Sequence, residues 1–364
     1  SFLEGLKTSS RAIIDPVVYM YADRHGGHLG TILSRMQVEW RSAQVRGDSF
    51  EEIFERTRSD LTTMGIDAVV VVSLTTRLAY FCKCPLAPVQ LWWPMKFPLP
   101  LFDNLQGRVD HGSIVRHSRM IDGKLWRGGP TAIPRPARPD REIVKAIRNQ
   151  YSGKKILGVI AREEKIAEQD FLDAIVQILR RHPDTVFLWT GRERLAAIDL
   201  AFQNGGIADR CHFVGWIDPT TYIEAFDVML ETYPLTGLVV AWAMTMGTPV
   251  ISIGDNGWLG VYLKPIFDGA IALSPEDRAK IDTIFEPIKS RLPGIWASTL
   301  EEIEPFADAL LEDKEFRQIV ARVQKEYVDT FMFDKVESAE IFAQHIVDVV
   351  NETWAASVSA TSAK

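Results

Sequence analysis

Short, continuously apolar runs alternate with amphipathic segments along residues 150–255. The apolar runs occupy residues 154–161, 185–191, 212–216 and 222–230, and the stretch that follows Pro249. Between the first two runs, residues 171–183 place their apolar side chains three or four positions apart, which is the spacing of one helical face. A short run that is apolar throughout is typical of a strand buried on both faces. The alternation therefore predicts a doubly wound parallel sheet with helices on both faces.

The first third of the chain shows the same alternation less regularly. VVYMYA (17–22) has strand character and is followed by Gly26, Gly27 and an amphipathic segment, His28 to Trp40, which we expect to be helical. Residues 50–64 also have a helical pattern, and they lead into the β-branched run 66–74. After residue 94 the pattern breaks into turns rich in Pro and Gly. These patterns predict a second α/β unit.

Length and proline content predict where the domains divide. At 364 residues the chain exceeds one ordinary core, so we expect two domains of roughly 150–200 residues. Residues 128–140 contain four prolines, which is typical of a linker. The predicted parts are an N-terminal Rossmann-like domain (1–128), a linker (129–150), a C-terminal Rossmann-like domain (151–334) and a C-terminal helix (335–355) that packs back toward the N-terminal domain. Ligands of such sheets bind beyond the carboxyl ends of the strands.

The composition is that of a folded protein without a membrane span, with 46% hydrophobic and 24% charged residues. The net charge of −7, with no basic stripe, argues against nucleic-acid binding. Cys82, Cys84 and Cys211 are too few and too irregularly spaced for a disulfide framework or a structural zinc site. Reduced thiols and the lack of a signal pattern favour a cytoplasmic protein.

The run from Asp227 to Ile253 is the most informative segment. It predicts a strand end, a turn containing Thr236 and Gly237, a helix from about Leu238 to Met246, and a second strand. Free backbone N–H groups and the positive end of a helix dipole together favour an anion at such a turn. An ordinary turn between a strand and a helix is the alternative, because every parallel sheet contains such turns.

Other polar residues follow predicted strands. His25, after the first strand, is a candidate general base, although a surface or helix-capping histidine is as compatible with its position. Arg162 and Lys165 follow the strand 154–161 and suit phosphate oxygens, but a solvated charged loop is equally compatible. Glu231 ends a buried strand and therefore needs a partner, such as a ribose hydroxyl.

Aromatic residues and glycines narrow the ligand class further. The pair Trp92-Trp93 could stack on a sugar or base, but packing in a core is the interpretation we favour. No G-x-G-x-x-G motif follows the first strand of either unit, which weakens the hypothesis of a dinucleotide-dependent oxidoreductase.

Four colinear segments between residues 66 and 354 resemble one family. These segments are RLAYFCKCPLAPVQLWWPMKFP (77–98), AREEKIAEQDFLDAIVQILRRHPDTVFLW (161–189), the run 227–253, and the closing pair ALLEDKEFRQIVARV and FDKVESAEIFAQHIVDVVNETW. They are similar to segments of the O-linked N-acetylglucosamine transferases and the bacterial adhesin N-glycosyltransferases. The resemblance implies a GT-B fold, that is, two Rossmann-like domains facing a cleft, with C-terminal helices. It assigns residues 1–128 to the acceptor side and residues 151–334 to nucleotide-sugar binding. It also implies a bacterial-type enzyme that transfers a hexosyl or N-acetylhexosaminyl group from a UDP-sugar to a protein or glycan, with inversion and without a metal or other cofactor.

The resemblance also implies roles for individual residues. Lys165 falls on the lysine that contacts the donor diphosphate, and His25 on a base candidate in the first N-terminal loop. The nucleotide-sugar site implied in this way, together with the strand-end positions, comprises Gln90, Arg162, Lys165, Trp216, Glu231, Thr236, Gly237, Leu238 and Val239.

Departures from the family pattern leave a second hypothesis open. Leu238 and Val239 stand where the family has two threonines, Trp242 stands where it has the ribose-binding aspartate, and Lys96 lies in place of a glycine. Only backbone N–H groups would then remain to bind phosphate at the turn. The alternative is a catalytically degenerate GT-B scaffold that acts as a binding or regulatory subunit. A sugar-nucleotide epimerase shares the fold but fits the segment around Gln90 poorly.

Overall fold

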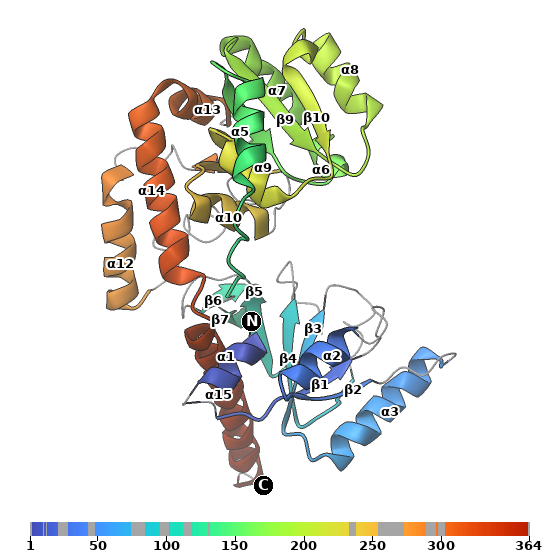
Figure 1. Ribbon diagram of the computed structural model, residues 1–364. Helices are drawn as coiled ribbons and strands as arrows, with labels where there is room; N and C mark the ends of the chain where they lie inside the picture. Colours follow the sequence, from blue (N-terminus) through green and yellow to red (C-terminus); the bar gives the residue numbers. More distant parts are fainter. Residues whose placement is uncertain are drawn as a thin grey trace. The chain divides into compact units, whose positions relative to one another are not determined.

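The computed structural model divides into two compact units, and each is described by itself (Figure 1). Unit 1 comprises residues 1–133 and 334–364, and unit 2 comprises residues 134–333. The structure describes residues 2–9, 11, 13–20, 28–42, 48–73, 84–94, 102, 104–111, 118–121, 123–129, 132–232, 238–253, 273–288, 296–297 and 303–362.

Unit 2 is built on a six-stranded sheet in which every neighbouring pair is parallel. Its strands are β8 (Lys155–Val159), β9 (Thr185–Thr190), β10 (Cys211–Gly215), β11 (Val228–Leu230), β12 (Val250–Ile253) and β13 (Trp296–Ala297). The spatial order is β10-β9-β8-β11-β12-β13. The strand order therefore reverses between β8 and β11, as the predicted doubly wound sheet requires.

The helices of unit 2 follow the strands in alternation. Helices α7 (Gln169–Arg181) and α8 (Ala196–Asn204) connect β8, β9 and β10. Helices α9 (Pro219–Ala225) and α10 (Leu238–Met246) lead to β11 and β12, and α5 (Arg141–Gln150) packs beside α9. Right-handed crossovers on the two sides of the order reversal place α7 and α8 on one face and α9 and α10 on the other. The bounds of α10 are those predicted from the sequence.

Part of the predicted linker is helical instead. Residues 141–150 form α5 because the Asp140 carboxylate accepts hydrogen bonds from the backbone N–H groups of Glu142 (3.0 Å) and Ile143 (3.2 Å). Asp140 itself donates its N–H to the Thr221 hydroxyl on α9 at 3.1 Å. This segment therefore belongs to unit 2 rather than to an extended connection.

Further helices complete the C-terminal half of unit 2. Helix α12 (Pro275–Phe285), which the sequence analysis missed, starts at Ser274, whose side chain accepts from Asp277 N. Helices α13 (Ile303–Glu312) and α14 (Lys314–Phe331) follow. The buried Gln324 of α14 donates its amide N–H to Val250 O (2.7 Å) and accepts from Val250 N (2.8 Å), which satisfies the backbone at the start of β12.

Unit 1 contains two sheets. A parallel pair joins β1 (Val17–Met20) to β2 (Glu39–Ser42), and the second sheet has the order β3-β4-β5-β7-β6. Its strands are β3 (Ala68–Ser73), β4 (Val89–Pro94), β5 (Gly107–His111), β6 (Arg119–Ile121) and β7 (Lys124–Gly129), and only the pair β6–β7 is antiparallel. Strands β5 to β7 lie in the region interpreted as turns, so that interpretation was incomplete.

The helices of unit 1 are α1 (Phe2–Thr8), α2 (His28–Arg35) and α3 (Phe50–Thr63). The predicted helix from His28 to Trp40 ends five residues early, because Gln37 takes a positive φ of 54° and β2 begins at Glu39. Helix α3 starts with a capping box in which the Ser49 and Glu52 side chains each accept from the other residue's backbone N–H.

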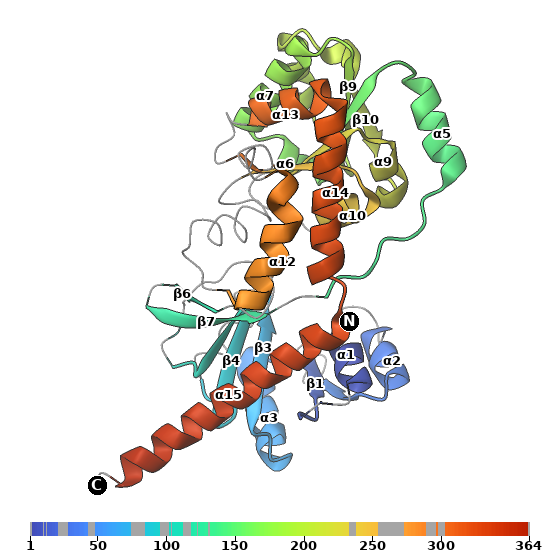
Figure 2. The ribbon, with the colours of Figure 1, turned by 90° about the vertical axis from the view of Figure 1, so that its left-hand side faces the viewer.

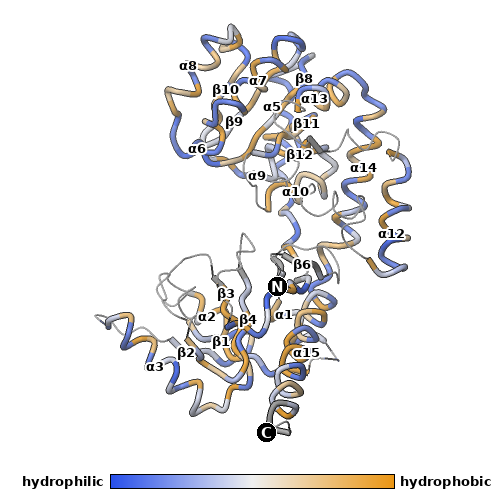
Figure 3. The backbone as a smooth tube through the Cα atoms, turned by 180° about the vertical axis from the view of Figure 1, so that it is seen from behind, coloured by the Kyte–Doolittle hydropathy of each residue, from blue (hydrophilic) through white to orange (hydrophobic). Residues whose placement is uncertain are grey.

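The C-terminal helix α15 runs from Lys335 to Ser362 and packs on unit 1 (Figure 2). Its side chains Phe342, Ile346 and Val349 share a core cluster with Val89, Leu91 and Val109 of the second sheet. Helix α1 lies along it, and the buried Arg127 of β7 donates to both carboxylate oxygens of Glu352 at 2.6 and 2.7 Å. Figure 3 shows hydrophobic and hydrophilic stretches alternating along α15, as expected for a helix with one buried face. Among the described helices, none has the length and hydrophobicity needed to cross a membrane.

Substituting Gly158 tests the close packing beneath the order reversal. A Cβ atom at this position of β8 would lie 2.1 Å from the Phe226 ring, so Gly158→Ala should lower the free energy of unfolding by about 1–3 kcal/mol. Chemical denaturation measures the loss, and adding Phe226→Leu should recover part of it because the smaller side chain makes room. An unchanged stability in Gly158→Ala would contradict the packing described.

A second prediction concerns the effect of low pH on the stability of unit 1, through His345 on the packed helix α15. Burial lowers the pKa of His345 below its ordinary value of 6.5. A hydrogen bond to Gly128 opposes this effect, the Arg127 charge lowers the pKa further, and the Asp348 charge opposes it. As the pH falls through about 6.5, the unfolded chain binds a proton that the folded chain resists. The free energy of unfolding should therefore decrease from about pH 7.5 to 5, and His345→Gln should show a weaker decrease. Equal pH dependence of the melting temperature in both proteins would refute this role.

Candidate functional site at the carboxyl edge of the unit 2 sheet

The carboxyl ends of β8 and β11 lie side by side at the strand-order reversal. The parallel register pairs Val228 with Leu157 and Met229 with Gly158, so the segments after Val159 and Leu230 emerge at the same edge. Helix α6 (Glu163–Ile166) follows β8, and Glu231 and Thr232 follow β11. In doubly wound sheets this is the position of the ligand-binding crevice.

The two cations predicted after β8 have different surroundings. Arg162 precedes α6, is exposed, and pairs with Glu164 at 2.9 Å. Lys165 lies within α6 and is partly buried, and its backbone N–H donates to Arg162 O at 3.0 Å. The exposed Arg162–Glu164 pair is neutral, so Arg162 offers little net positive charge to an anion.

Thr190 joins the segments that follow β8 and β9. Its hydroxyl donates to Ala161 O at 2.9 Å and accepts from Ala161 N at 3.0 Å, and the residue is buried. These bonds satisfy the polar backbone atoms of Ala161, the residue just before Arg162. We call the segment from the end of β8 through α6 the loop of Lys165. Its position therefore depends on β9 as well as on β8.

Glu163 makes a second connection between the same two segments. Its carboxylate accepts from the backbone N–H of Arg192 at 2.8 Å. Hydrogen bonds from its own N–H and from that of Arg192 lower the pKa of Glu163, so it stays ionised. Gly191 allows this approach, since a Cβ atom there would lie 2.9 Å from a Glu163 carboxylate oxygen.

Trp216 presents an open aromatic face beyond β10. Its side chain is 69% exposed, and the Arg192 guanidinium lies 5.2 Å from the ring centroid, a cation–π contact. Gly215, with φ of +77°, makes the turn that ends β10 before Trp216. An exposed indole backed by a cation is suited to stacking on a planar ring.

Glu231 and Thr232 are both buried at the end of β11. The Glu231 N–H donates to Ile251 O at 2.9 Å, which continues the ladder toward β12. Among the described residues, the Thr232 hydroxyl has no hydrogen-bond partner. Two buried polar side chains beside the loop of Lys165 are the acceptors and donors that a polar ligand needs.

Helix α10 begins at Leu238 and Val239, which are both partly buried, and continues into the core with Val240 and Ala241. Thr236 and Gly237, predicted to form the anion-binding turn, lie outside the described residues, as does His25. One turn into the helix, the Trp242 indole donates to Pro134 O at 2.8 Å. The residue at the ribose-binding position of the resembled family therefore bonds to the segment that enters unit 2.

Gln90 lies in β4 of unit 1, where it is buried and its side-chain oxygen accepts from Leu86 N at 2.6 Å. The structure thus assigns this oxygen to holding the preceding loop. Trp92 and Trp93 pack in hydrophobic clusters of unit 1, as the packing interpretation expected.

Glu163 was not predicted from the sequence to belong to the candidate site, and neither were Thr190 and Arg192. Their positions in the sequence could have identified them, because Thr190 ends β9 while Glu163 and Arg192 lie within four residues of a strand end. Strand ends of a doubly wound sheet are where ligand-binding groups gather.

Replacing Thr190 tests how the loop of Lys165 is held. Thr190→Val keeps the shape but leaves Ala161 N and O without partners, which should cost about 1–3 kcal/mol of unfolding free energy. Thr190→Ser keeps the hydroxyl and should cost clearly less, as measured by denaturant titration. If the valine variant is as stable as the wild-type protein, Thr190 does not tie the two loops.

Residues 154–270 match the family model described as glycosyl transferases group 1, a range that contains α6, Glu231 and α10. No curated protein sequence matches the chain significantly.

Solved structures share the fold over nearly the whole chain. A mutant O-GlcNAc transferase from Thermobaculum terrenum superposes with a TM-score of 0.62 at 17% identity, covering 96% of this chain and 65% of its own. Anabaena Alr3699/HepE, in complex with UDP and glucose, gives 0.59 at 13% identity and covers 95% of both chains. A glycosyltransferase from Rickettsia africae gives 0.59 at 12% identity over 97% of this chain and 94% of its own.

The chain spans 65% of the length of the Thermobaculum protein. The shared fold nevertheless covers 96% of the present chain. The chain therefore has the GT-B fold and resembles the GT-B glycosyltransferases, including O-GlcNAc transferase, and its residues 154–270 match the model of the glycosyl transferases group 1.

Proposed function

We propose that the chain is a glycosyltransferase that uses a nucleotide-sugar, a UDP-sugar in the first place, as its donor. The observation that supports the proposal is the pairing of β8 with β11 at the strand-order reversal, because Lys165 follows β8, Glu231 and then α10 follow β11, and all of them lie within the group 1 match. The UDP and glucose bound to the Anabaena neighbour support the donor class.

Each group at the edge has a role in this proposal. The ammonium group of Lys165 offsets the charge that develops on the departing diphosphate, and backbone N–H groups at Leu238 and Val239 add the positive end of α10. Trp216, backed by Arg192, stacks on the nucleobase. Glu231 accepts a hydrogen bond from a ribose hydroxyl.

Fixed cationic and dipolar groups can stabilise a leaving diphosphate directly, and on that ground we propose a transfer that needs no metal. Inversion, His25 as the base, and a protein or glycan acceptor are further parts of the proposal, and they rest on the resemblance of the sequence.

One observation favours a second candidate, a GT-B scaffold that binds no donor. In the sequence resemblance Trp242 stands in place of the ribose-binding aspartate, and in the structure its indole N–H donates to Pro134 O. A scaffold of this kind would act as a binding or regulatory subunit.

A donor screen distinguishes the two candidates. Release of UDP, dTDP and GDP from their sugar conjugates should be highest for UDP-sugars, and Lys165→Ala should reduce it about 100-fold or more, in the range of other lost electrostatic contacts to a transition state. Lys154→Ala is the matched control, because Lys154 lies before the amino end of β8 and should leave turnover unchanged. Normal turnover in Lys165→Ala would overturn the assignment, and no turnover with any donor would favour the scaffold.

A further inference from the structure

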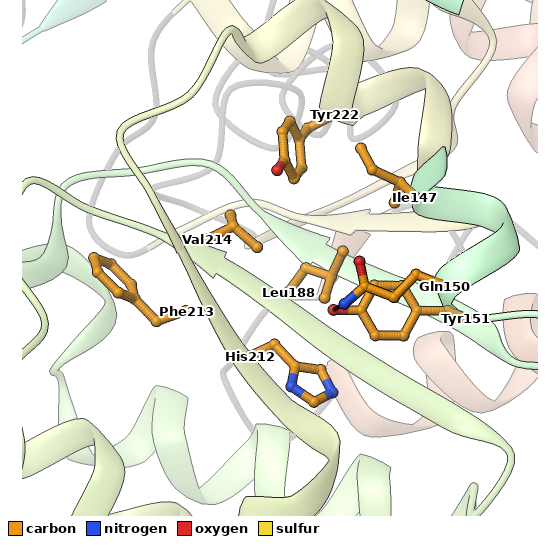
Figure 4. A pocket seen from close by; sticks show the side chains of 8 residues that line it. All are labelled: Ile147, Gln150, Tyr151, Leu188, His212, Phe213, Val214 and Tyr222. Atoms are coloured by element: carbon orange, nitrogen blue, oxygen red, sulfur yellow. Dashed lines mark hydrogen bonds between the residues drawn. The ribbon is translucent and has the colours of Figure 1, made fainter. Parts of the chain in front are cut away.

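A cavity of about 270 Å³ lies on the face of the unit 2 sheet that carries α5 and α9, along the edge strand β10. Leu188 and Val214 contribute from the strands, Gln150 and Tyr151 from the end of α5, and Tyr222 from α9. Figure 4 shows Tyr222 on one side of the cavity, with Tyr151 and His212 on the other. The carboxyl-edge residues Lys165 and Glu231 do not line it.

The lining is polar but uncharged. Within the described part of the chain, neither an acidic residue nor a lysine or arginine borders the cavity. Burial lowers the pKa of His212, so its imidazole is neutral near pH 7 and can both donate and accept a hydrogen bond. Anionic ligands such as a nucleoside diphosphate lack a cation here, which leaves neutral ligands.

The arrangement of apolar and polar groups narrows the ligand class. The rings of Tyr151 and His212 lie 5.2 Å apart and tilted by 33°, so they form one continuous aromatic wall opposite Tyr222. Two phenol hydroxyls, an imidazole and the Gln150 amide supply hydrogen bonds around an apolar base of Leu188 and Val214. The volume lies just below the range of about 300–1,000 Å³ of pockets for drug-sized ligands, so it suits a single ring.

We propose that this cavity binds one neutral hexose unit. A pyranose has an apolar C–H face that packs on an aromatic ring and a rim of hydroxyls that both donate and accept, which matches the two kinds of group in the cavity. Val214 lies on β10, two residues before Trp216. A hexose held here therefore lies in the same unit as the proposed donor site, but against a face of the sheet and not at its carboxyl edge. The role of the cavity would be to anchor an acceptor glycan away from the reacting sugar. This role rests on the proposed function, whereas hexose binding itself does not.

Ligand-observed NMR of the full chain with glucose, galactose, mannose and N-acetylglucosamine tests the proposal. At least one hexose should bind saturably with a dissociation constant in the millimolar range, about −4 kcal/mol, and excess UDP should not displace it. Tyr222→Ala should weaken binding about tenfold or more, in line with the loss of a well-packed aromatic contact. Tyr222→Phe keeps the ring and should bind more tightly than the alanine variant.

Two further variants make the result specific. Gln150 is exposed, so Gln150→Ala should leave the fold intact while it weakens hexose binding. Leu200→Ala is the control, because Leu200 is 56% exposed on α8, across the sheet, and should bind like the wild-type protein. Melting temperatures confirm that each variant is folded.

Three results would overturn the proposal: no saturable binding of any of the four hexoses up to about 100 mM, displacement by UDP, or equal binding by Tyr222→Ala and the wild-type protein. Donor turnover measured on the same samples separates the two hypotheses. Turnover without hexose binding overturns only the cavity assignment. Hexose binding without turnover supports the cavity and removes the acceptor role.

Discussion

The pairing of β8 with β11 is the constraint on which the candidate site depends. Both strands are buried and parallel, and they are neighbours although two strands and four α-helices separate them in the chain. Asp227 fixes this pairing at its start: its carboxylate accepts from Ile156 N and Arg148, both at 2.8 Å, while its own N–H donates to Ile156 O at 2.8 Å. The loop of Lys165 and the buried Glu231 share one edge because of this pairing.

The side-chain bonds at the edge then hold the loops that the sheet brings together. Thr190 satisfies the backbone of Ala161, and Glu163 accepts from Arg192, so the segments after β8 and β9 are joined twice. Arg192 in turn lies against Trp216 after β10. The ends of four neighbouring strands therefore carry the cation, the aromatic face and the buried polar groups that the proposed nucleotide-sugar site uses.

Most of unit 2 could be predicted from the sequence because its strands are buried on both faces and therefore read as continuous apolar runs. Helix α10 was predicted to the residue, since Gly237 and Gly247 enclose a short apolar segment. Helix α12 was missed because its buried apolar residues, Ile281, Ile284 and Phe285, gather in its second half. In unit 1, the helix expected to reach Trp40 gave way to β2, where pairing with β1 overrides a local helical pattern.

The candidate site was predictable only in part. The positions of Lys165 and Glu231 at strand ends follow from the pattern and the resemblance, but Thr190, Arg192 and the engagement of Trp242 with Pro134 depend on contacts between distant segments. The central claim, that this edge binds a nucleotide-sugar, is tested most directly by calorimetric titration of the full chain with UDP. We expect saturable one-to-one binding with a dissociation constant below about 1 mM, equivalent to −4.1 kcal/mol. A folded protein that shows no heat of binding at millimolar UDP would contradict it.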